Sequence, residues 1–298
     1  MNRDQLSVLS GTVLAQKTDM IWLLPAILGM AMLLSCSGES ARVKTEEPLE
    51  ADQTSSATIE FAPPSPETIP GSQLGEQIRL GYRIVVNTQE YARPYVGNRL
   101  NCTNCHLDGG LNPNAASFVG LAAVYPEYHA RNARVNTLAD RVNECFERSL
   151  NGRALPPDSS KLQAIVAYIT WLSRGVPSGA TLPWRGLQFI DSRRLLDPDN
   201  GEKVFANKCA FCHGSDGLGT MSAPPVLGPQ SYNIAADMAR VTVAAAFIKS
   251  NMPRARGWSL SDDDAYDVAA YVNSQPRPEF ADKIRDRPKG GKPEDAPY

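Results

Sequence analysis

The sequence predicts an all-α fold made of two tandem helical domains. The chain has 298 residues, which is enough for two domains because single domains typically contain ~100–150 residues. The pentapeptide pattern C-x-x-C-H occurs twice, at residues 102–106 and 209–213. A helix-like segment precedes each copy, and another closes each domain. We therefore expect one helical unit twice, at residues 71–190 and 191–280, followed by a mobile tail at 281–298.

The segments around the motifs carry the periodicity and caps of helices. Before the first motif, one face of an amphipathic helix holds Leu74, Ile78, Tyr82 and Val85. Residues 161–175 form the closing helix of the first domain. The closing helix of the second domain follows Ser261, whose hydroxyl suits an N-cap, and has acidic residues in its first turn, where the helix dipole favours them.

Composition and cysteine usage narrow the class of protein. Hydrophobic residues make up 42% of the chain and charged residues 21%, as in ordinary soluble proteins. A net charge of −2 gives no reason to expect nucleic-acid binding. Four of the six cysteines fall in the two motifs, and Cys36 and Cys145 lie far apart. This distribution argues against a disulfide framework and for separate roles of the two single cysteines.

Each C-x-x-C-H motif is typical of covalent haem c attachment. Two thiols three residues apart reach the two vinyl groups of haem, and the imidazole that follows binds iron. A zinc site built from paired C-x-x-C motifs would not need a histidine after each second cysteine. We therefore predict two class I cytochrome c-like domains and two covalent haem c groups. His106 and His213 bind iron, and the thioether cysteines are Cys102, Cys105, Cys209 and Cys212.

The N-terminal segment predicts export. Residues 21–35 are uncharged and follow Lys17, but they are shorter than the ~20 residues of a spanning helix and fit the apolar region of a signal peptide. The segment ends at Leu33, Leu34 and Ser35 before Cys36, which resembles the lipobox of bacterial lipoproteins. We expect a signal peptide at 1–36 and lipidation of Cys36, with a membrane anchor on the periplasmic side. A plain cleaved signal and an uncleaved anchor are the alternatives.

Residues 37–70 predict a disordered tether between this anchor and the folded domains. They are rich in Glu, Thr, Ser and Pro and contain few large apolar residues. Such a segment cannot bury enough surface to offset the entropy lost on ordering.

The second axial ligand of the first haem cannot be a methionine of its own domain, because no methionine lies between Met32 and Met221. The candidates are Cys145 and His129, and an open site is a third possibility. Cys145 belongs to an apolar stripe at helical spacing and should face the haem. A buried structural cysteine is the alternative. The stripe consists of Val135, Leu138, Val142, Cys145 and Phe146.

The second haem has a methionine in the expected place. Met252 lies just before the closing helix, where class I cytochromes have their ligand, and Lys249 is its main rival. Thiolate ligation lowers a haem potential, and methionine ligation raises it. Electrons should therefore pass from the first haem to the second.

Arginines gather around Cys145. Arg141 precedes it by four residues, and Arg148 follows it by three, so both flank it on the helix. Guanidinium groups suit small oxyanions. A solvated helix with paired charges is the alternative reading of the same pattern.

Residues 81–275 resemble the dihaem cytochrome c thiosulfate dehydrogenases, which are exported bacterial proteins. The resemblance rests on both motifs and on the cysteine helix, in the segments GYRIVVNT, VGNRLNCTNCHLDGG, RVNTLADRVNECFERSLNG, YITWLSRGVP, KCAFCHGSDGLG and SYNIAADMARVTVAAAFIKSNMP.

The resemblance implies oxidation of two thiosulfates to tetrathionate, which some members favour in reverse. It implies His106/Cys145 ligation, with the cysteine leaving iron to carry a sulfur adduct. Haem two of the family has His/Met or His/Lys ligation, and Asn251 before Met252 favours His213/Met252 here. Arg141 and Arg148 are carried over as catalytic residues.

Elementary chemistry agrees with this assignment. Joining two thiosulfate dianions needs positive charge to offset their repulsion and a sulfur atom to act as nucleophile. It also needs groups that remove electrons one at a time, which two haems can do. The acceptor would be a periplasmic or membrane protein such as another cytochrome c. Three alternatives stay open: a tethered, non-catalytic dihaem electron carrier, a dihaem peroxidase, and a cytochrome that loads thiosulfate onto a carrier protein.

Overall fold

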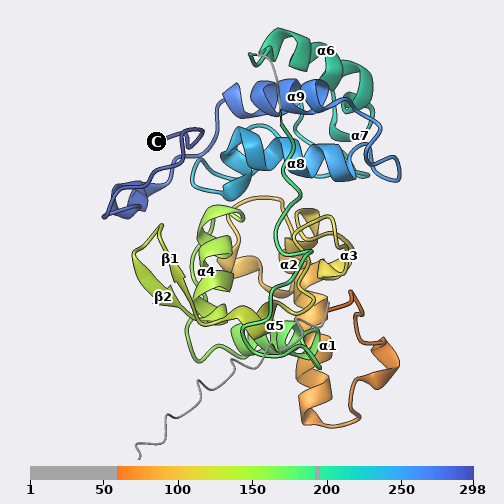
Figure 1. The fold of residues 1–298 in the computed structure, drawn as a ribbon, viewed down its shortest axis with the longest axis vertical. Coiled ribbons are helices and arrows are strands. Elements are labelled where there is room, and N and C mark those ends of the chain that lie inside the picture. The colour runs from red at the N-terminus through yellow and green to blue at the C-terminus, as the bar shows by residue number, and fades with distance from the viewer. Residues whose placement is uncertain (1–58, 192–194) are drawn as a thin grey trace, which may run out of the picture. The chain divides into compact units, whose positions relative to one another are not determined.

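Helices and loops dominate the computed structural model, which describes residues 59–191 and 195–298. Within these ranges there is a single sheet of two strands. Figure 1 shows α1 (Gln73–Val86) and α5 (Ser160–Trp171) together in one group of helices. The second group contains α6 (Pro198–Lys208), α8 (Val241–Asn251) and α9 (Asp262–Ser274). The predicted all-α class is confirmed, with one small hairpin added.

The first group is organised around the crossing of α1 and α5. Gly81 lies at this crossing, where an added Cβ would come within 2.0 Å of the carbonyl oxygen of Ala164. Ile78 and Val85 are buried as predicted, whereas Leu74 and Tyr82 are exposed. Because α1 contacts α5 closely at Gly81, the buried face of α1 is rotated from the face that the sequence predicted. Two of the four predicted positions are therefore buried, and two are not.

Short elements connect α1 to the cysteine helix. They include α2 (Thr88–Tyr91), η2 (Arg93–Tyr95), η3 (Cys102–Asn104), α3 (Leu107–Gly110) and η4 (Leu121–Val124). Strand β1 (Glu127–His129) then pairs antiparallel with β2 (Arg134–Asn136), which places Glu127 opposite Asn136.

The cysteine helix is α4 (Leu138–Arg148), which starts later than the apolar stripe suggested. The Thr137 hydroxyl accepts from the Asp140 amide at 3.1 Å, and the Asp140 carboxylate accepts from the Thr137 amide at 2.9 Å. This capping box stops the helix from extending further back. Val135 therefore belongs to β2 and is exposed.

In the second group, α6 and α9 also cross closely at a glycine. Gly201 of α6 lies where an added Cβ would come within 2.0 Å of the Asp267 carbonyl oxygen on α9. Ser261 caps α9 by accepting from the Asp264 amide at 3.0 Å, which confirms the predicted N-cap. The remaining elements are α7 (Ala210–His213), η5 (Asp237–Ala239), η6 (Ala281–Arg285) and η1 (Pro66–Thr68).

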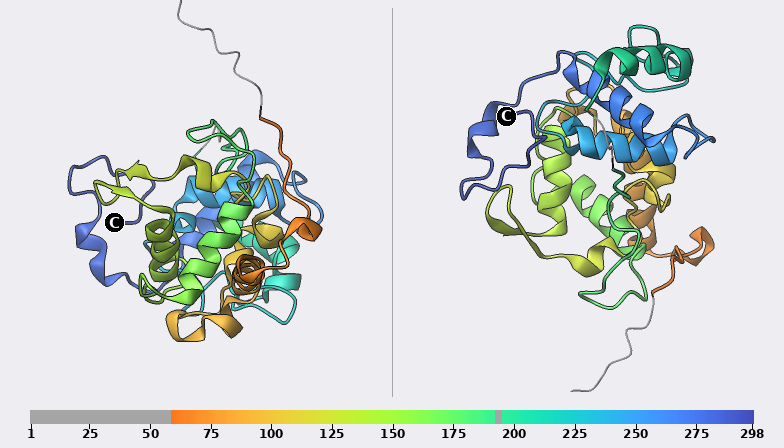
Figure 2. Two further views of the ribbon diagram at one scale, coloured as in Figure 1. Left: turned by 90° about the horizontal axis from the view of Figure 1, so that it is seen from below. Right: turned by 45° about the horizontal axis from the view of Figure 1, so that its top comes forward.

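The two groups share packing. Tyr168 and Phe146 are among the largest fully buried side chains of the first group. Tyr232, Ala236 and Ala239, which follow the second motif in the chain, belong to the same cluster. Figure 2 shows the two groups from two further directions. Sequence after the second motif therefore completes the core of the first group.

The segment predicted as a mobile tail makes specific contacts. Asp286 pairs with Arg148, and Asp295 pairs with Arg240 at 2.8 Å. The amide of Arg287 donates to the carbonyl of Arg131 at 2.6 Å. In Figures 1 and 2 the tail runs beside the β1–β2 hairpin.

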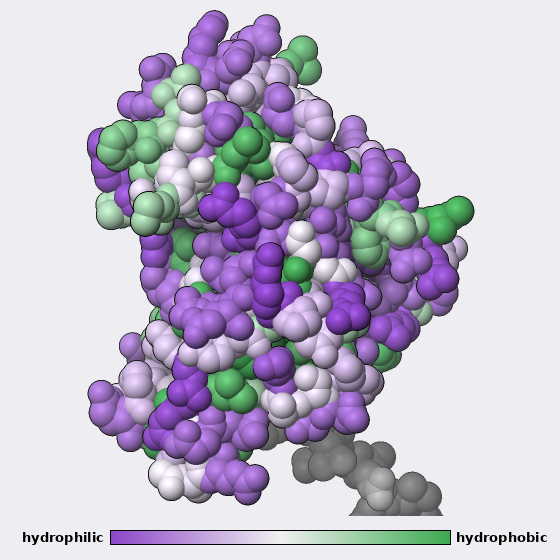
Figure 3. Space-filling model, turned by 180° about the vertical axis from the view of Figure 1, so that it is seen from behind, coloured by the Kyte–Doolittle hydropathy of each residue, from purple (hydrophilic) through white to green (hydrophobic). Residues whose placement is uncertain are grey.

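The predicted signal peptide at 1–36, Cys36 and most of the tether lie outside the described residues. At the end of the tether segment, the Phe61 ring meets the Trp184 ring edge-on, with 5.1 Å between centroids. In the described ranges, no helix combines the length and apolar character that crossing a membrane requires. The face in Figure 3 is mostly hydrophilic with scattered apolar residues, as is normal for a protein surface.

Candidate functional site

The first C-x-x-C-H motif lies on a cavity of about 220 Å³. Cys102, Cys105 and His106 line this cavity, and Cys145 lines it from α4. The lining is mostly apolar, with side chains such as Val85 and Ile165. The structure therefore brings together the first-domain haem residues that the sequence predicted.

Local hydrogen bonds orient the motif. The Nδ1 atom of His106 lies 2.8 Å from the carbonyl oxygen of Ala116. This contact assigns the proton to Nδ1 and leaves Nε2 as the nitrogen that can bind a metal. Burial lowers the pKa of His106 to about 4, which keeps the imidazole neutral. On the other side of the motif, the amide of Cys102 donates to the Thr88 hydroxyl at 3.0 Å.

Cys145 offers a second ligand to the same cavity. Burial raises the pKa of its thiol, and the positive charge of Arg141 opposes that effect. The cavity therefore offers the thiols of Cys102 and Cys105, the imidazole of His106 and the further thiol of Cys145. This donor set suits covalent haem c with a sulfur axial ligand. The residues present therefore fit the group.

His129, the rival ligand, is occupied elsewhere. Its Nε2 lies 3.3 Å from the Tyr125 hydroxyl, and its Nδ1 lies 3.7 Å from the Glu144 carboxylate. It is not among the residues that line the cavity. The geometry thus favours Cys145 over His129.

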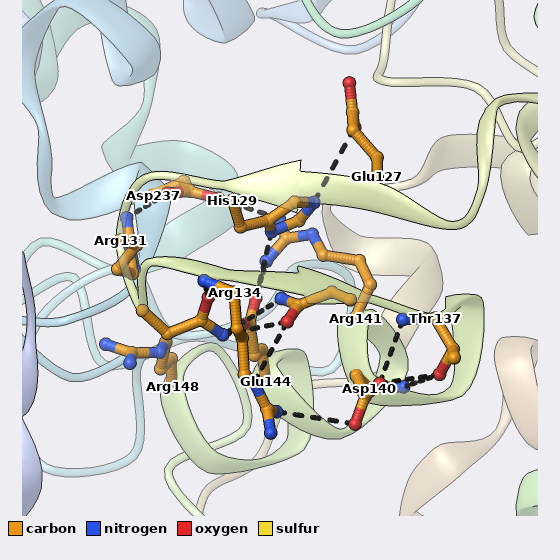
Figure 4. A network of polar contacts seen from close by, with 12 residues as sticks. Glu127, His129, Arg131, Arg134, Thr137, Asp140, Arg141, Glu144, Arg148 and Asp237 are labelled. Carbon is orange, nitrogen blue, oxygen red and sulfur yellow. Dashed lines mark hydrogen bonds and ion pairs between the residues drawn. The ribbon is translucent and has the colours of Figure 1, made fainter.

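Arg141, on the wall of the cavity, belongs to a chain of alternating charges (Figure 4). Arg141 pairs with Glu144 at 3.2 Å and with Asp237 at 2.8 Å. Asp237 also pairs with Arg131. Burial would raise the pKa of Asp237, but Arg141 and Arg131 hold it well below its ordinary value. A carboxylate that follows the second motif in the chain therefore holds Arg141 on the wall of the first cavity and links it to Arg131.

Glu144, next to Cys145, is the buried member of this chain. It is only 7% exposed. Its carboxylate accepts from Asn132 at 3.0 Å and from Asn136 at 2.9 Å. These bonds, with the Arg141 pair, satisfy a charge that would otherwise be costly to bury.

Arg148 does not line the cavity. Both of its terminal nitrogens lie 2.7 Å from the Asp286 carboxylate, and its guanidinium stacks over the Phe280 ring at 4.5 Å. In Figure 4 its side chain points away from that of Arg141. The two arginines that the sequence grouped as catalytic are therefore separated, because Arg148 is directed into the C-terminal tail.

The polar residues Tyr125 and Arg185 line the cavity. The sequence reasoning named neither of them as a site residue. Arg185 comes from the segment between the two helix groups, some forty positions after Cys145. No spacing in the sequence links these residues to the motif, since only the folded loops bring them near it.

A second cavity of about 670 Å³ surrounds the second motif. Cys209, Cys212, His213 and Met252 all line it. The Nδ1 atom of His213 lies 2.8 Å from the Pro224 carbonyl oxygen, which repeats the orientation of the first histidine. A thioether, an imidazole and two thiols again fit haem c.

Lys249 is engaged away from this second cavity. Its ammonium group lies 2.6 Å from the Asp262 carboxylate and 2.7 Å from the Leu260 carbonyl oxygen. It is not among the lining residues, whereas Met252 is. The geometry therefore favours Met252 as the ligand.

The two cavities are neighbours. Leu100 and Cys105 line both of them. Tyr232, Met238 and Asn104 also lie on the second cavity, so both helix groups contribute to its wall. Two redox groups held in these cavities would be separated by only a few side chains.

Comparison with known proteins gives matches for both helix groups. Residues 88–178 match the SoxA/TsdA cytochrome c domain family, and residues 196–272 match the family described as cytochrome C oxidase, cbb3-type, subunit III. The chain thus has two cytochrome c domains, a class of domain that binds haem c.

Relatives that match most of the chain, and a solved structure, extend this similarity. Thiosulfate dehydrogenase of Psychrobacter arcticus is 39% identical over 89% of this chain and 86% of that protein. The enzyme of Allochromatium vinosum is 42% identical over 77% of this chain and 88% of that protein. The as-isolated structure of thiosulfate dehydrogenase (TsdBA) from Marichromatium purpuratum aligns with a TM-score of 0.68 and 37% identity, covering 73% of this chain and 50% of that one.

Proposed function

Because the chain belongs to the thiosulfate dehydrogenase family, we propose that it oxidises two thiosulfates to one tetrathionate at the cavity lined by Cys145 and Arg141. One S–S bond forms between the two sulfane sulfurs, and each thiosulfate gives up one electron. No proton is released. Two electrons leave to an acceptor, for which another cytochrome c is the natural class.

The two motifs hold the redox groups. Cys102 and Cys105 would attach one haem c through their thiols, and Cys209 and Cys212 would attach the other. His106 and His213 would bind iron through their imidazoles, and Cys145 and Met252 would each add a sulfur donor. When bound, haem c would supply one-electron acceptance. The thiolate of Cys145 would lower the potential of the first site and the thioether of Met252 would raise that of the second, so electrons would pass from the first site to the second.

Cys145 is the sulfur relay in this proposal. Its sulfur bonds to the sulfane sulfur of the first thiosulfate, and the pair loses two electrons to give a cysteine S-thiosulfonate. The sulfane sulfur of a second thiosulfate then attacks the same sulfane atom. The bond to Cys145 breaks, tetrathionate leaves, and the thiolate is restored. Read backwards, the same steps reduce tetrathionate.

Arg141 offsets the negative charge that these steps bring together. A thiolate and two dianions repel one another, and a fixed cation near the reacting atoms reduces that cost without solvent reorganisation. Asp237 and Glu144 hold the Arg141 guanidinium in place from two sides. Arg148, which pairs with Asp286 instead, has a proposed structural role.

The cellular setting follows from the sequence. The signal-like segment at 1–36 and the lipobox-like end at Cys36 support export to the periplasmic side with a lipid anchor. Haem c domains agree with export.

The observation that carries the proposal is that Cys145, Arg141 and His106 share one cavity. We would assay the purified holoprotein with thiosulfate and an artificial one-electron acceptor, beside Cys145→Ala. Acceptor reduction with tetrathionate formation in the wild type, and loss of both in the variant with the second haem spectrally intact, supports the function. A wild type that is inert to thiosulfate and to tetrathionate would be an electron carrier instead.

A further inference from the structure

The loop between the two helix groups is anchored at several points beside the first cavity. Leu182 is buried. The indole nitrogen of Trp184 donates to the Val119 carbonyl oxygen at 2.8 Å, and the amide of Arg185 donates to the Leu182 carbonyl oxygen at 3.0 Å. Arg185 is therefore presented by a fixed turn and not by a free strand of linker.

The anchored turn directs Arg185 to the catalytic cavity. Arg185 and Gly186 line the same cavity as Cys145, Arg141 and Tyr125. The side chain of Arg141 is 28% exposed and that of Arg185 is 39% exposed. The cavity thus has one arginine on its cysteine helix and a second, more exposed arginine contributed by the connecting loop.

The acidic partner of Arg185 leaves it able to bind a further anion. The Glu127 carboxylate on β1 accepts from Nη1 of Arg185 at 3.0 Å and also from Nη2. A guanidinium has five N–H donors in a planar fork, and this pair uses two of them. The pair orients the fork and still leaves donors for an oxyanion.

We propose that Arg185 binds the second thiosulfate anion, at the outer part of the cavity, while Arg141 serves the first beside Cys145. The inference rests on the proposed function, which needs two anions in succession at one sulfur atom. The first anion, once bonded to Cys145, still carries a sulfonate charge. A separate cation at the entrance lets the second anion approach without displacing Arg141 from its carboxylates.

The test compares holoprotein carrying Arg185→Gln, Arg185→Lys or the control Arg174→Gln, which alters an exposed arginine just beyond α5. In Arg185→Gln the KM for thiosulfate should rise about tenfold or more, as expected for loss of a charge-assisted hydrogen bond, while kcat changes much less. Arg185→Lys should recover part of the loss, because lysine keeps the charge but not the fork. The control should match the wild type.

The alternative anion for Arg185 is a carboxylate of the first haem itself, and this alternative predicts a different experimental result. In that case Arg185→Gln would shift the reduction potential or absorption spectrum of the first haem without substrate and leave the KM unchanged. That result overturns the proposal, as does a variant with unchanged KM and unchanged spectrum.

A protein without thiosulfate dehydrogenase activity can be distinguished from a protein whose Arg185 does not bind thiosulfate. If the wild type shows no turnover, thiosulfate binding is measured by calorimetric titration of the wild type, Arg185→Gln and Arg174→Gln. Weaker binding in Arg185→Gln alone supports an anion site at Arg185 in a protein that is not a dehydrogenase. Equal binding by all three proteins overturns the anion site.

Discussion

The Oδ2 atom of Asp237 lies 2.8 Å from the Nη2 atom of Arg141, and this contact joins η5, which follows the second motif in the chain, to the cysteine helix α4. The other oxygen of the same carboxylate pairs with Arg131. Arg141, which lines the first cavity, and Arg131 are thus both paired with one residue from the second half of the chain. The haem domains are coupled through their charges as well as through shared packing.

Replacing this carboxylate should impair catalysis more than substrate binding. In Asp237→Asn, Arg131 loses its carboxylate partner and Arg141 loses one of its two. We therefore expect kcat to fall about 10- to 100-fold, the size of effect that misplacing a catalytic group produces. The KM for thiosulfate should not rise, because removing a negative charge does not weaken anion binding. Steady-state kinetics beside Asp158→Asn, an exposed aspartate outside the network, checks this. A higher KM with unchanged kcat would contradict it.

The pair between Arg148 and Asp286 should contribute to stability. Their side chains are 10% and 5% exposed. Arg148→Gln leaves a buried carboxylate without its cationic partner, so we expect the free energy of unfolding to fall by about 3 kcal/mol. The double change Arg148→Met with Asp286→Leu should cost much less, since it removes both charges. Urea unfolding followed by circular dichroism gives the values, and limited proteolysis should show earlier cleavage of the tail in Arg148→Gln.

The control for that experiment is Arg285→Gln, whose side chain is 79% exposed and whose loss should change stability little. A catalytic role of Arg148 predicts the opposite pattern. Arg148→Gln would then lose kcat with its stability unchanged, and Asp286→Asn would leave turnover intact.

The same pair should make stability depend on acid pH. Burial would raise the pKa of Asp286, but hydrogen bonds from Arg148 and Tyr298 hold it below its ordinary value. Its stabilisation is therefore complete above the unfolded pKa of about 3.9 and is lost as the pH falls through the lower folded pKa. We expect the difference in unfolding free energy between wild type and Asp286→Asn to shrink as the pH drops below about 4. If the difference in unfolding free energy stays constant as the pH falls well below about 4, the charge of the Asp286 carboxylate does not cause the stabilisation.

Cys145 should control both turnover and the potential of the first haem. Cys145→Met replaces a thiol with a thioether, so the potential of that haem should rise by on the order of 100 mV, within the ~0.8 V range that axial ligands span. Turnover should fall more than about 1,000-fold, because a thioether cannot form the sulfur adduct. Potentiometric titration and the thiosulfate assay measure the two effects. Unchanged potential would mean that Cys145 is not a ligand.

Met252 should set the potential of the second haem alone. Met252→Leu removes the thioether, so that potential should fall by on the order of 100 mV, and the first haem should keep its spectrum. Lys249→Met is the matched comparison. It breaks the ion pair with Asp262 and should leave the second potential almost unchanged. A large shift in Lys249→Met with none in Met252→Leu would make lysine the ligand.

The strongest sequence predictions concern residues close together in the chain. The cysteines and histidine of each motif need only a tight turn to face one haem, so the pentapeptides predicted both sites. Periodicity located the closing helices, and the Ser261 cap is confirmed. The start of α4 was placed too early, because the capping box of Thr137 and Asp140 ends the helix where the apolar stripe continues.

The partners of the reactive cysteine show where sequence alone was insufficient. Arg141 and Arg148 look equivalent along one helix, yet one meets Asp237 and the other Asp286. Arg185 reaches the cavity from a loop with no helical period at all. By itself the sequence determined two haem-binding helical domains and the candidate axial ligands, since those depend on local spacing. Only the tertiary structure decided which charges surround Cys145, because each arginine is paired by packing with a carboxylate that lies far away in the chain, 96 residues on for Arg141 and 138 residues on for Arg148.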